Sequence, residues 1–303
     1  MIIVGAGMAG LLAANMLRKH KPIIYEKSKE VPNNHNSVLR FRSSIVGDTL
    51  GIPFKKVNMI KTAVPWLNPV ADAMAYSFKN TGVRRSDRSI TSGLVSEVRY
   101  IAPPDLIQQM VSWSGNIYLQ REFDFDSPPT IPIISTIPMP FLMQALDYKD
   151  DTWDGNFTWT SGATLRARIK DCDAYVSLLV PSPMFNFSRI SITGDELFIE
   201  IHNQKDIQFE NGLVRQAATL LAIDQEQFTD VELKPQKFSK IIPINDIARK
   251  RFMHWATVNH NIYSLGRFAT WRPSLLLDDL VNDIRLIEKW ITQGHKYEVA
   301  KVS

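Results

Sequence analysis

The sequence contains very little cysteine, which limits both its covalent structure and its expected location. Among its 303 residues there is a single cysteine, Cys172, so no disulfide can form within the chain. Disulfide frameworks belong to oxidising compartments, and proteins of reducing compartments do without them. We therefore expect a cytoplasmic protein.

Long apolar runs and metal-binding spacings are also missing. Beyond residues 1–17, no stretch approaches the roughly 18 uncharged apolar residues that a membrane-spanning helix needs, and residues 1–17 are interrupted by three glycines. We therefore expect no membrane partner. The six histidines and the cysteine include no pair at H-x-x-x-H or C-x-x-C spacing, so no metal site is predicted.

The charge balance lacks the dense basic tracts of a dedicated nucleic-acid-binding protein. Lys and Arg total 35 and Asp and Glu total 31, which gives a net charge of +4 and a pI of about 9.0. This mild basic excess permits an anionic substrate without requiring one. With 45% hydrophobic and 22% charged residues, the chain has the composition of an ordinary globular protein. Its length suits two lobes.

The chain does contain a glycine-rich turn between a strand and a helix. Residues 1–4 predict a short strand, residues 8–19 a helix, and residues 23–25 a second strand that ends at Glu26. The turn fits G-x-G-x-x-G and consists of Gly5, Ala6, Gly7, Met8, Ala9 and Gly10. A β-α-β unit with this turn and a following acidic residue is typical of a dinucleotide-binding Rossmann domain.

Each part of this motif has a physical task in binding a dinucleotide. Gly5 permits the tight turn, Gly7 lets the backbone approach a pyrophosphate, and Gly10 permits close packing of helix on strand. The helix N-terminus offers amide donors to the phosphates, and Glu26 accepts hydrogen bonds from a ribose. These residues alone leave FAD and NAD both open.

Segments at the start, middle and end of the chain resemble the FAD-dependent oxidoreductases, in particular the amine oxidases and UDP-galactopyranose mutases. The segments that carry the resemblance are residues 3–11, 24–27, 133–138 and 264–272. The resemblance implies that a Gly-Arg pair meets the cofactor and that the first amides of the last helix face the flavin. Beyond the turn and Glu26, the cofactor-binding residues that it implies are Lys27, Pro138, Gly266, Arg267, Leu275 and Leu276.

Two elements of these families are absent from the sequence. The Gly-Gly-Arg element of the amine oxidases is missing, and we expect Arg40 and Arg42 at the pyrophosphate in its place. The histidine-rich segment of the mutases is also missing, although His35 lies in a comparable region. Because the expected cofactor contacts return at the far end of the chain, FAD is favoured over NAD.

The predicted fold class is α/β, with a Rossmann-like FAD-binding domain (GR2-type) and a second, mixed α+β substrate domain that contains an antiparallel sheet. The FAD-binding domain is expected to comprise residues 1–48, 98–150 and 238–303, and the substrate domain residues 49–97 and 151–237. Short runs predict strands at 164–169, 174–180, 188–193 and 196–201. We also expect a strand pair around Pro235 and a last helix over residues 274–292.

Three groups of residues are candidates for contact with the substrate. Trp271 and Arg272 are the predicted substrate-facing catalytic residues, and the alternative is core packing plus a salt bridge. Arg84, Arg85 and Arg88 form either a clamp for a phosphate or carboxylate or a solvated loop. Arg166, Arg168 and Arg189 either donate to an anionic substrate or lie on the outer face of the sheet.

The function that these observations favour is an FAD-dependent oxidoreductase that is amine oxidase-like and oxidises a C–N bond. The expected partner is a small-molecule or nucleotide-like substrate, which includes an amino-bearing nucleotide or modified DNA base. A non-redox flavoenzyme that resembles UDP-galactopyranose mutase and a flavin-bound scaffold protein stay open as alternatives. The sequence predicts no oligomeric state.

Overall fold

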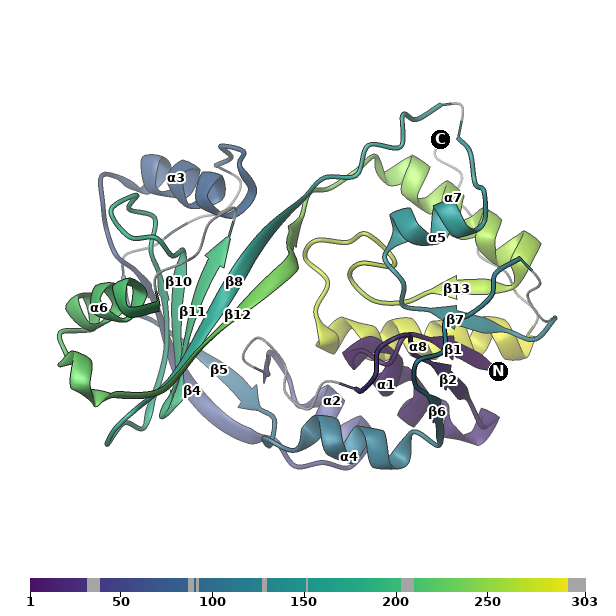
Figure 1. Ribbon diagram of the computed structural model, residues 1–303, viewed down its shortest axis with the longest axis horizontal. Coiled ribbons are helices and arrows are strands. Elements are labelled where there is room, and N and C mark those ends of the chain that lie inside the picture. Colours follow the sequence, from purple (N-terminus) through teal and green to yellow (C-terminus); the bar gives the residue numbers. More distant parts are fainter. Residues whose placement is uncertain are drawn as a thin grey trace.

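The protein is described by a computed structural model that covers residues 1–31, 39–86, 90, 93–126, 130–150, 152–202 and 210–293. These residues form two lobes, each built on its own sheet (Figure 1). A five-stranded parallel sheet lies in the first lobe and an eight-stranded, mostly antiparallel sheet in the second. The predicted fold class is thus confirmed.

The five-stranded sheet has the order β13-β7-β1-β2-β6, and all its neighbouring strands are parallel. Its strands are β1 (Ile2–Val4), β2 (Ile23–Tyr25), β6 (Asn116–Tyr118), β7 (Ile133–Ser135) and β13 (Ile262–Ser264). Strands β13, β7 and β1, which lie side by side, are fully buried, as their apolar sequences require. The chain passes from β1 to β2 on one side, and β7 flanks β1 on the other. The topological switch point, where α/β sheets bind ligands, therefore lies beside β1.

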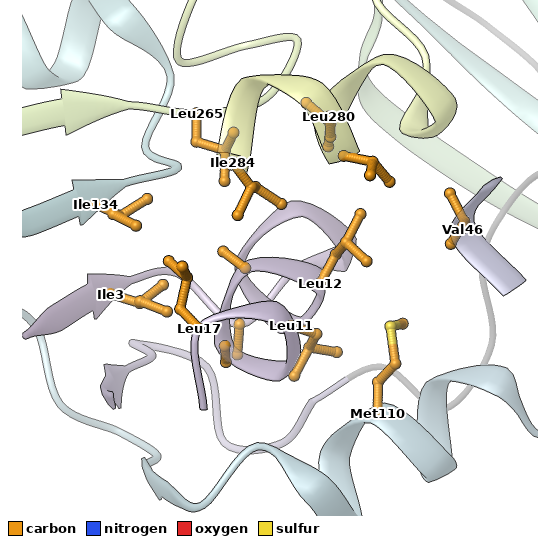
Figure 2. Packing of buried hydrophobic residues seen from close by; sticks show 14 of the residues in the cluster. Ile3, Leu11, Leu12, Leu17, Val46, Met110, Ile134, Leu265, Leu280 and Ile284 are labelled. Carbon is orange, nitrogen blue, oxygen red and sulfur yellow. The ribbon is translucent and has the colours of Figure 1, made fainter. Parts of the chain in front are cut away.

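Helices cover both faces of this sheet. One side carries α1 (Met8–Met16), α2 (Ile45–Leu50), α4 (Leu106–Trp113) and α8 (Leu277–Gln293), with the 3-10 turn η1 (Arg18–His20), and the other carries α5 (Met139–Ala145) and α7 (Asp246–His260). Leu11 and Leu12 of α1 are fully buried in a cluster with Met110 and Ile284 (Figure 2). Burial of one such side chain contributes about 1.5–3 kcal/mol, so the packing holds α1 against its neighbours.

The eight-stranded sheet has the order β12-β8-β11-β10-β9-β4-β5-β3, and of these pairs only β4 and β9 are parallel among the described residues. Its strands are β3 (Arg40–Phe41), β4 (Lys55–Ala63), β5 (Val95–Ile101), β8 (Trp159–Ile169), β9 (Ala174–Leu179), β10 (Arg189–Gly194), β11 (Glu196–His202) and β12 (Phe228–Ile241). One face packs against α6 (Glu210–Leu221), beside the 3-10 turn η2 (Gln225–Gln227). On the opposite face, α3 (Pro69–Thr81) packs near one end of the sheet.

The structure differs from the sequence-based expectations in three respects. The strand pair expected around Pro235 is one long edge strand, β12, whose pairing with β8 shifts register twice. Proline is tolerated there because an edge strand need not donate on both sides. Strands β3, β4 and β5 were not predicted, and the last helix begins at Leu277 rather than at Ser274.

The expected domain boundaries stay a prediction, although β5 spans the boundary at residues 97 and 98 and β12 spans that at 237 and 238. Among the described residues, no helix is both long enough and apolar enough to cross a membrane.

Candidate functional site

The three glycines of the turn between β1 and α1 have different surroundings. Gly5 has a φ of +101°, and a Cβ there would lie 2.2 Å from Thr136 Oγ1. A Cβ on Gly10 would lie 1.9 Å from the carbonyl oxygen of Gly5. A Cβ on Gly7 would meet nothing within 4 Å, because this residue borders open space. Glycine is therefore needed at positions 5 and 10 because a side chain would clash with other atoms of the chain. At position 7 the lack of a side chain leaves room for a ligand.

The helix N-terminus that faces this space is open to an anion. Gly7 is the N-cap of α1, no side chain caps the helix, and its first turn contains no acidic residue. Met8 and Ala9 follow as the first helical residues and are partly exposed. The first amides of a helix lack partners within the helix and lie at the positive end of its dipole.

Glu26 is held beside the turn by two backbone amides, and its carboxylate keeps further acceptor positions. The Ala6 amide donates to Glu26 Oε2 over 2.7 Å, and the Ser28 amide donates to Glu26 Oε1 over 2.9 Å. An ionised carboxylate has about four acceptor positions, so Glu26 can still accept hydrogen bonds from a diol. The neighbouring side chain of Lys27 is exposed.

Segments from the middle and end of the chain meet this turn, as the sequence led us to expect. Gly266 has a φ of +99°, and a Cβ there would lie 3.1 Å from Ala9 Cβ. The Met139 amide, which follows Pro138, donates to the Phe268 carbonyl over 2.9 Å. The Ser264 hydroxyl at the end of β13 is buried without a hydrogen-bond partner among the described residues. The predicted cofactor-binding residues of β1–α1, Pro138 and Gly266 therefore lie at one edge of the parallel sheet.

The amides of Leu275 and Leu276, which are expected to face the flavin, both donate hydrogen bonds within the chain. The Leu275 amide donates to the Arg272 carbonyl over 3.1 Å. The Leu276 amide donates to Asp279 Oδ2 over 2.9 Å. The third residue of α8 thus caps the amide of the residue that precedes the helix, as in a capping box. The helix that was expected to present these amides starts only at Leu277.

Arg40 and Arg42 lie on a segment that is tied to α8. The amides of Arg42 and Ser43 donate to the Asp278 carboxylate over 3.3 Å and 3.0 Å, and the Arg42 side chain is exposed. Arg40 is different, because burial lowers its pKa to about 10. Its Nη1 atom is buried and has no hydrogen-bond partner in the described part of the chain. A buried guanidinium nitrogen without a partner is a donor that requires an acceptor.

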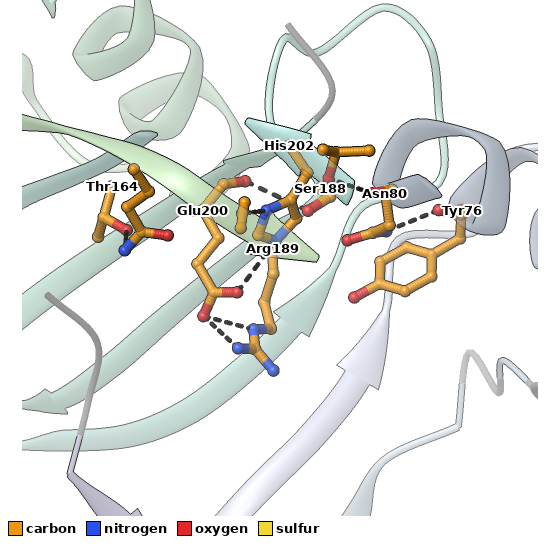
Figure 3. A network of polar contacts seen from close by, with 10 residues as sticks. Tyr76, Asn80, Thr164, Ser188, Arg189, Glu200 and His202 are labelled. Carbon is orange, nitrogen blue, oxygen red and sulfur yellow. Dashed lines mark hydrogen bonds and ion pairs between the residues drawn. The ribbon is translucent and has the colours of Figure 1, made fainter. Parts of the chain in front are cut away.

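The charges that act on Arg40 belong to the polar face of the eight-stranded sheet, which is centred on Arg189 and Glu200. These two residues are directly opposite one another on β10 and β11. Arg189 Nε donates to Glu200 Oε1 over 2.9 Å, and Arg189 Nη2 donates to the same oxygen (Figure 3). Burial alone raises the pKa of Glu200, but Arg189 and His202 hold it well below its ordinary value. Glu200 is thus a carboxylate.

His202 adds a buried neutral group to this face. Its Nδ1 atom shares a hydrogen bond with Ser239 Oγ, and its Nε2 atom lies 3.4 Å from Glu200 Oε2. Burial lowers the pKa of His202 to about 4, so the imidazole is neutral near pH 7. The hydroxyls of Ser191 and Thr193 on the same face are buried without partners among the described residues. Such atoms require ordered water or a ligand.

Arg267 connects the two lobes electrostatically. It follows Gly266 at the edge of the parallel sheet, and burial lowers its pKa while Glu200 raises it in part. Glu200 is therefore close enough to act on the Gly-Arg pair that was predicted to meet the cofactor. The polar face of the second lobe therefore lies on the side of Arg267 in the first lobe.

Comparisons with known proteins identify this architecture. No family model and no curated protein matches the chain. Among solved structures, a reduced UDP-galactopyranose mutase matches with a TM-score of 0.72 and 13% identity, covering 98% of this chain and 96% of that one. Glycine oxidase from Bacillus cereus matches with a TM-score of 0.57 and 11% identity, covering 100% and 99%. Aklavinone-11 hydroxylase in complex with FAD and aklavinone matches with a TM-score of 0.51 and 11% identity, covering 97% and 62%. The chain has the fold of these flavoenzymes. The similarity expected from the sequence is confirmed at the level of the fold.

Within this fold, Trp271 and Arg272 make the contacts expected if they serve core packing and a salt bridge. Trp271 is only 1% exposed, and its Nε1 donates to the Ile242 carbonyl over 2.8 Å. Arg272 forms an ion pair with Asp283. The ion pair lines a surface cavity of about 330 Å³ at the start of α8. These contacts correspond to core packing for Trp271 and a salt bridge for Arg272.

The basic cluster after α3 does not form a clamp in the described residues. Arg84 and Arg85 are exposed, and the Arg84 guanidinium lies over the Phe78 ring at 4.4 Å from its centre. Lys79 is used internally, because its Nζ donates to the carbonyls of Val180, Ser182 and Phe187. Arg88 lies outside the described residues, as does His35. Arg84 and Arg85 therefore match the solvated alternative.

Arg166 and Arg168 share the polar face with Arg189 but are neutralised by acidic neighbours. Arg166 pairs with Glu196, and Arg168 Nη1 lies 2.5 Å from Asp195 Oδ2. Arg168 is 51% exposed. The idea that these two arginines bind an anionic substrate loses its support, because their charges are already compensated at the turn between β10 and β11.

We expect Arg168→Ala to leave flavin content and activity unchanged. An exposed ion pair contributes about 0–1 kcal/mol, so the midpoint of urea unfolding should shift only slightly. Absorbance of the purified variant and an unfolding curve test this expectation. A variant that lost turnover while keeping its flavin would restore Arg168 as a substrate contact.

Proposed function

We propose that the chain binds FAD non-covalently and is an FAD-dependent oxidoreductase. The observation that carries the proposal is the open space at Gly7, at the switch point of a parallel sheet. Glu26 lies beside this space, and its carboxylate accepts only two backbone hydrogen bonds among the described residues. Glu26 would hold the adenosine ribose, the amides after Gly7 would hold the pyrophosphate, and Gly266 with Arg267 would border the flavin. The cofactor supplies a two-electron acceptor for hydride.

The residues on the polar face would bind and orient the substrate. Arg40 and Arg267 are half-buried arginines that form no ion pair among the described residues, and they provide donors for an anionic or strongly polar group. Glu200 and the neutral His202 provide acceptor atoms, and Arg189 fixes Glu200. We propose oxidation of a C–N bond in a small or nucleotide-like substrate, a class that includes an amino-bearing nucleotide or modified DNA base.

A second candidate is non-redox flavin chemistry on a nucleotide sugar. One observation favours it, since the mutase has a higher TM-score than the glycine oxidase or the hydroxylase. The two candidates differ in one measurement. Anaerobic mixing of the oxidised holoprotein with amines should bleach the flavin absorbance if the chain is an oxidase. If no amine bleaches it and only the dithionite-reduced protein transforms a nucleotide sugar, the non-redox alternative is correct.

The cofactor assignment predicts that Glu26→Ala lowers FAD affinity roughly tenfold or more. Hydrogen bonds to a charged group are worth about 1.5–3 kcal/mol each, and the change removes the carboxylate that would accept from the ribose. The chromatogram of the heat-released supernatant identifies the cofactor, and equilibrium dialysis gives its affinity. Release of FMN, or unchanged FAD affinity in Glu26→Ala, contradicts the assignment. Lys29→Ala is the matched control, because that side chain is exposed and is not among the residues expected at the cofactor.

A further inference from the structure

Four aromatic side chains from four separate elements meet where the two lobes join. Phe141 comes from α5, Trp159 from the first residue of β8, Phe238 from the end of β12, and Phe268 from the loop after β13. The ring centre of Phe238 lies 5.1 Å from that of Trp159, 5.8 Å from Phe268 and 6.1 Å from Phe141. We call these four residues the aromatic surface.

The aromatic surface is partly open to solvent, unlike the neighbouring core. Phe141 is 39% exposed and Trp159 is 37% exposed, whereas Trp271, which lies next to Trp159, is 1% exposed. Phe238 and Phe268 are half-buried. Packing within the chain therefore covers the Trp271 side chain but leaves part of the aromatic surface exposed to solvent. Apolar surface of this kind beside convergent polar groups is typical of ligand sites.

The aromatic surface adjoins both halves of the candidate site. Phe268 directly follows Arg267, and its carbonyl accepts from the Met139 amide beside Pro138. Phe238 directly precedes Ser239, the partner of His202. A group that lay on these rings would thus be next to the residues expected at the cofactor and next to the polar face.

The charges around the rings restrict what can bind. The Arg267 guanidinium lies 4.7 Å from the centre of the Phe268 ring, and Lys237 Nζ lies 5.6 Å from that of Phe238. Two cations already interact with these ring faces, so they repel a substrate ammonium group. An uncharged planar ring meets no such repulsion and gains from stacking and edge contacts.

We propose that the aromatic surface binds a planar, uncharged ring of the substrate, so that the substrate class is aromatic or heteroaromatic. The assignment of this ring to the substrate rests on the proposed function of the site. The polar groups of the same molecule would then lie toward Arg267, Glu200 and His202. A purely aliphatic amine would leave the aromatic surface unused.

The test compares two neutral probes of similar size, planar benzamide and non-planar cyclohexanecarboxamide, by calorimetric titration of the holoprotein. We expect benzamide to bind at least fivefold more tightly. Phe238→Leu removes the ring that contacts the other three, so it should weaken benzamide binding by roughly fivefold or more. Phe141→Leu serves if Phe238→Leu does not fold. Trp113→Leu is the control, because Trp113 is similarly exposed at 42% but lies on α4.

Equal affinity for the two probes, no detectable binding of benzamide, or benzamide affinity unchanged in the folded aromatic variants would overturn the proposal. The FAD content of each preparation is measured separately by heat release. If the protein carries no FAD but discriminates the probes, the ring site stands and the cofactor assignment fails. If it carries FAD but does not discriminate them, the ring site fails alone.

Discussion

Gly7→Val is expected to yield a folded protein that has lost FAD. The backbone of Gly7 has a φ of −71° and a ψ of 177°, which any residue adopts, and a Cβ there meets no atom within 4 Å. The chain therefore tolerates the side chain apart from a poorer N-cap, which costs about 1 kcal/mol. The valine would instead fill the space that the pyrophosphate needs. We expect FAD occupancy to fall at least tenfold.

Gly10→Ala provides the contrasting result. Its Cβ would lie 1.9 Å from the Gly5 carbonyl oxygen, so α1 must move away from β1. This variant should lose thermal stability as well as flavin, whereas Gly7→Val should lose flavin alone. Circular dichroism melting curves and FAD per chain separate the two outcomes. If Gly7→Val kept its FAD, the turn would not be a phosphate site.

The parallel lobe was predictable because its signals are local. Apolar strands, a glycine turn and a following acidic residue occur within residues 1–26, and each supports the same β-α-β unit. The return of Gly266 to the same turn was available only from the family resemblance. No spacing in the sequence indicates that Gly266 packs against Ala9, since this contact depends on the tertiary fold.

The polar face was only partly predictable. The turn at Thr193-Gly194-Asp195 fixes the register of β10 and β11, and counting outward from it pairs Arg189 with Glu200. This signal was present in the sequence and was missed, because the arginines were considered without their cross-strand partners. The contact of His202 with Ser239 joins strands that are not neighbours in the sheet order, and the charges that act on Arg40 come from other strands of its sheet. Neither follows from local patterns.

Trp271 shows why a position in the sequence is weak evidence for a role. It stands between the Gly-Arg pair and the last helix, which suggested a place near the substrate. In the structure its indole donates to the Ile242 carbonyl and its ring contacts Phe157 at 4.8 Å in the core. The exposed aromatics, Trp159 and Phe141, come from segments that gave no such signal. Exposure cannot be deduced from residue type, because large apolar residues occur on both surfaces and cores.

Arg189→Met is expected to cause the largest loss of stability of any change on the polar face. Glu200 is 8% exposed, and the variant would leave its carboxylate buried without its main partner. Removing one member of a buried ion pair costs about 3–5 kcal/mol. We expect the lower end of this range, because the Arg189 side chain is 32% exposed and water can relax around it.

The double variant Arg189→Met/Glu200→Met should recover more than half of this loss. It removes both charges and replaces them with apolar side chains of similar length, and such replacements are often neutral. Urea unfolding of the wild type, both single variants and the double variant completes the cycle. A double variant as unstable as Arg189→Met would show that the loss came from packing of the Arg189 stem and not from the unpaired charge.

The pH dependence of the same variant gives an independent test with a defined sign. In the wild type, the pKa of Glu200 lies well below the ordinary value of 4.5, since Arg189 and His202 outweigh the effect of burial. Its contribution to stability is therefore present above pH 4.5 and is lost as the pH falls. Without Arg189, burial raises the pKa of Glu200, and a protonated carboxyl group is neutral and tolerates burial. The deficit of Arg189→Met should thus be full at pH 7.5 and should shrink at pH 5. A deficit that is equal at both pH values would mean that Glu200 is not an unpaired buried carboxylate in the variant.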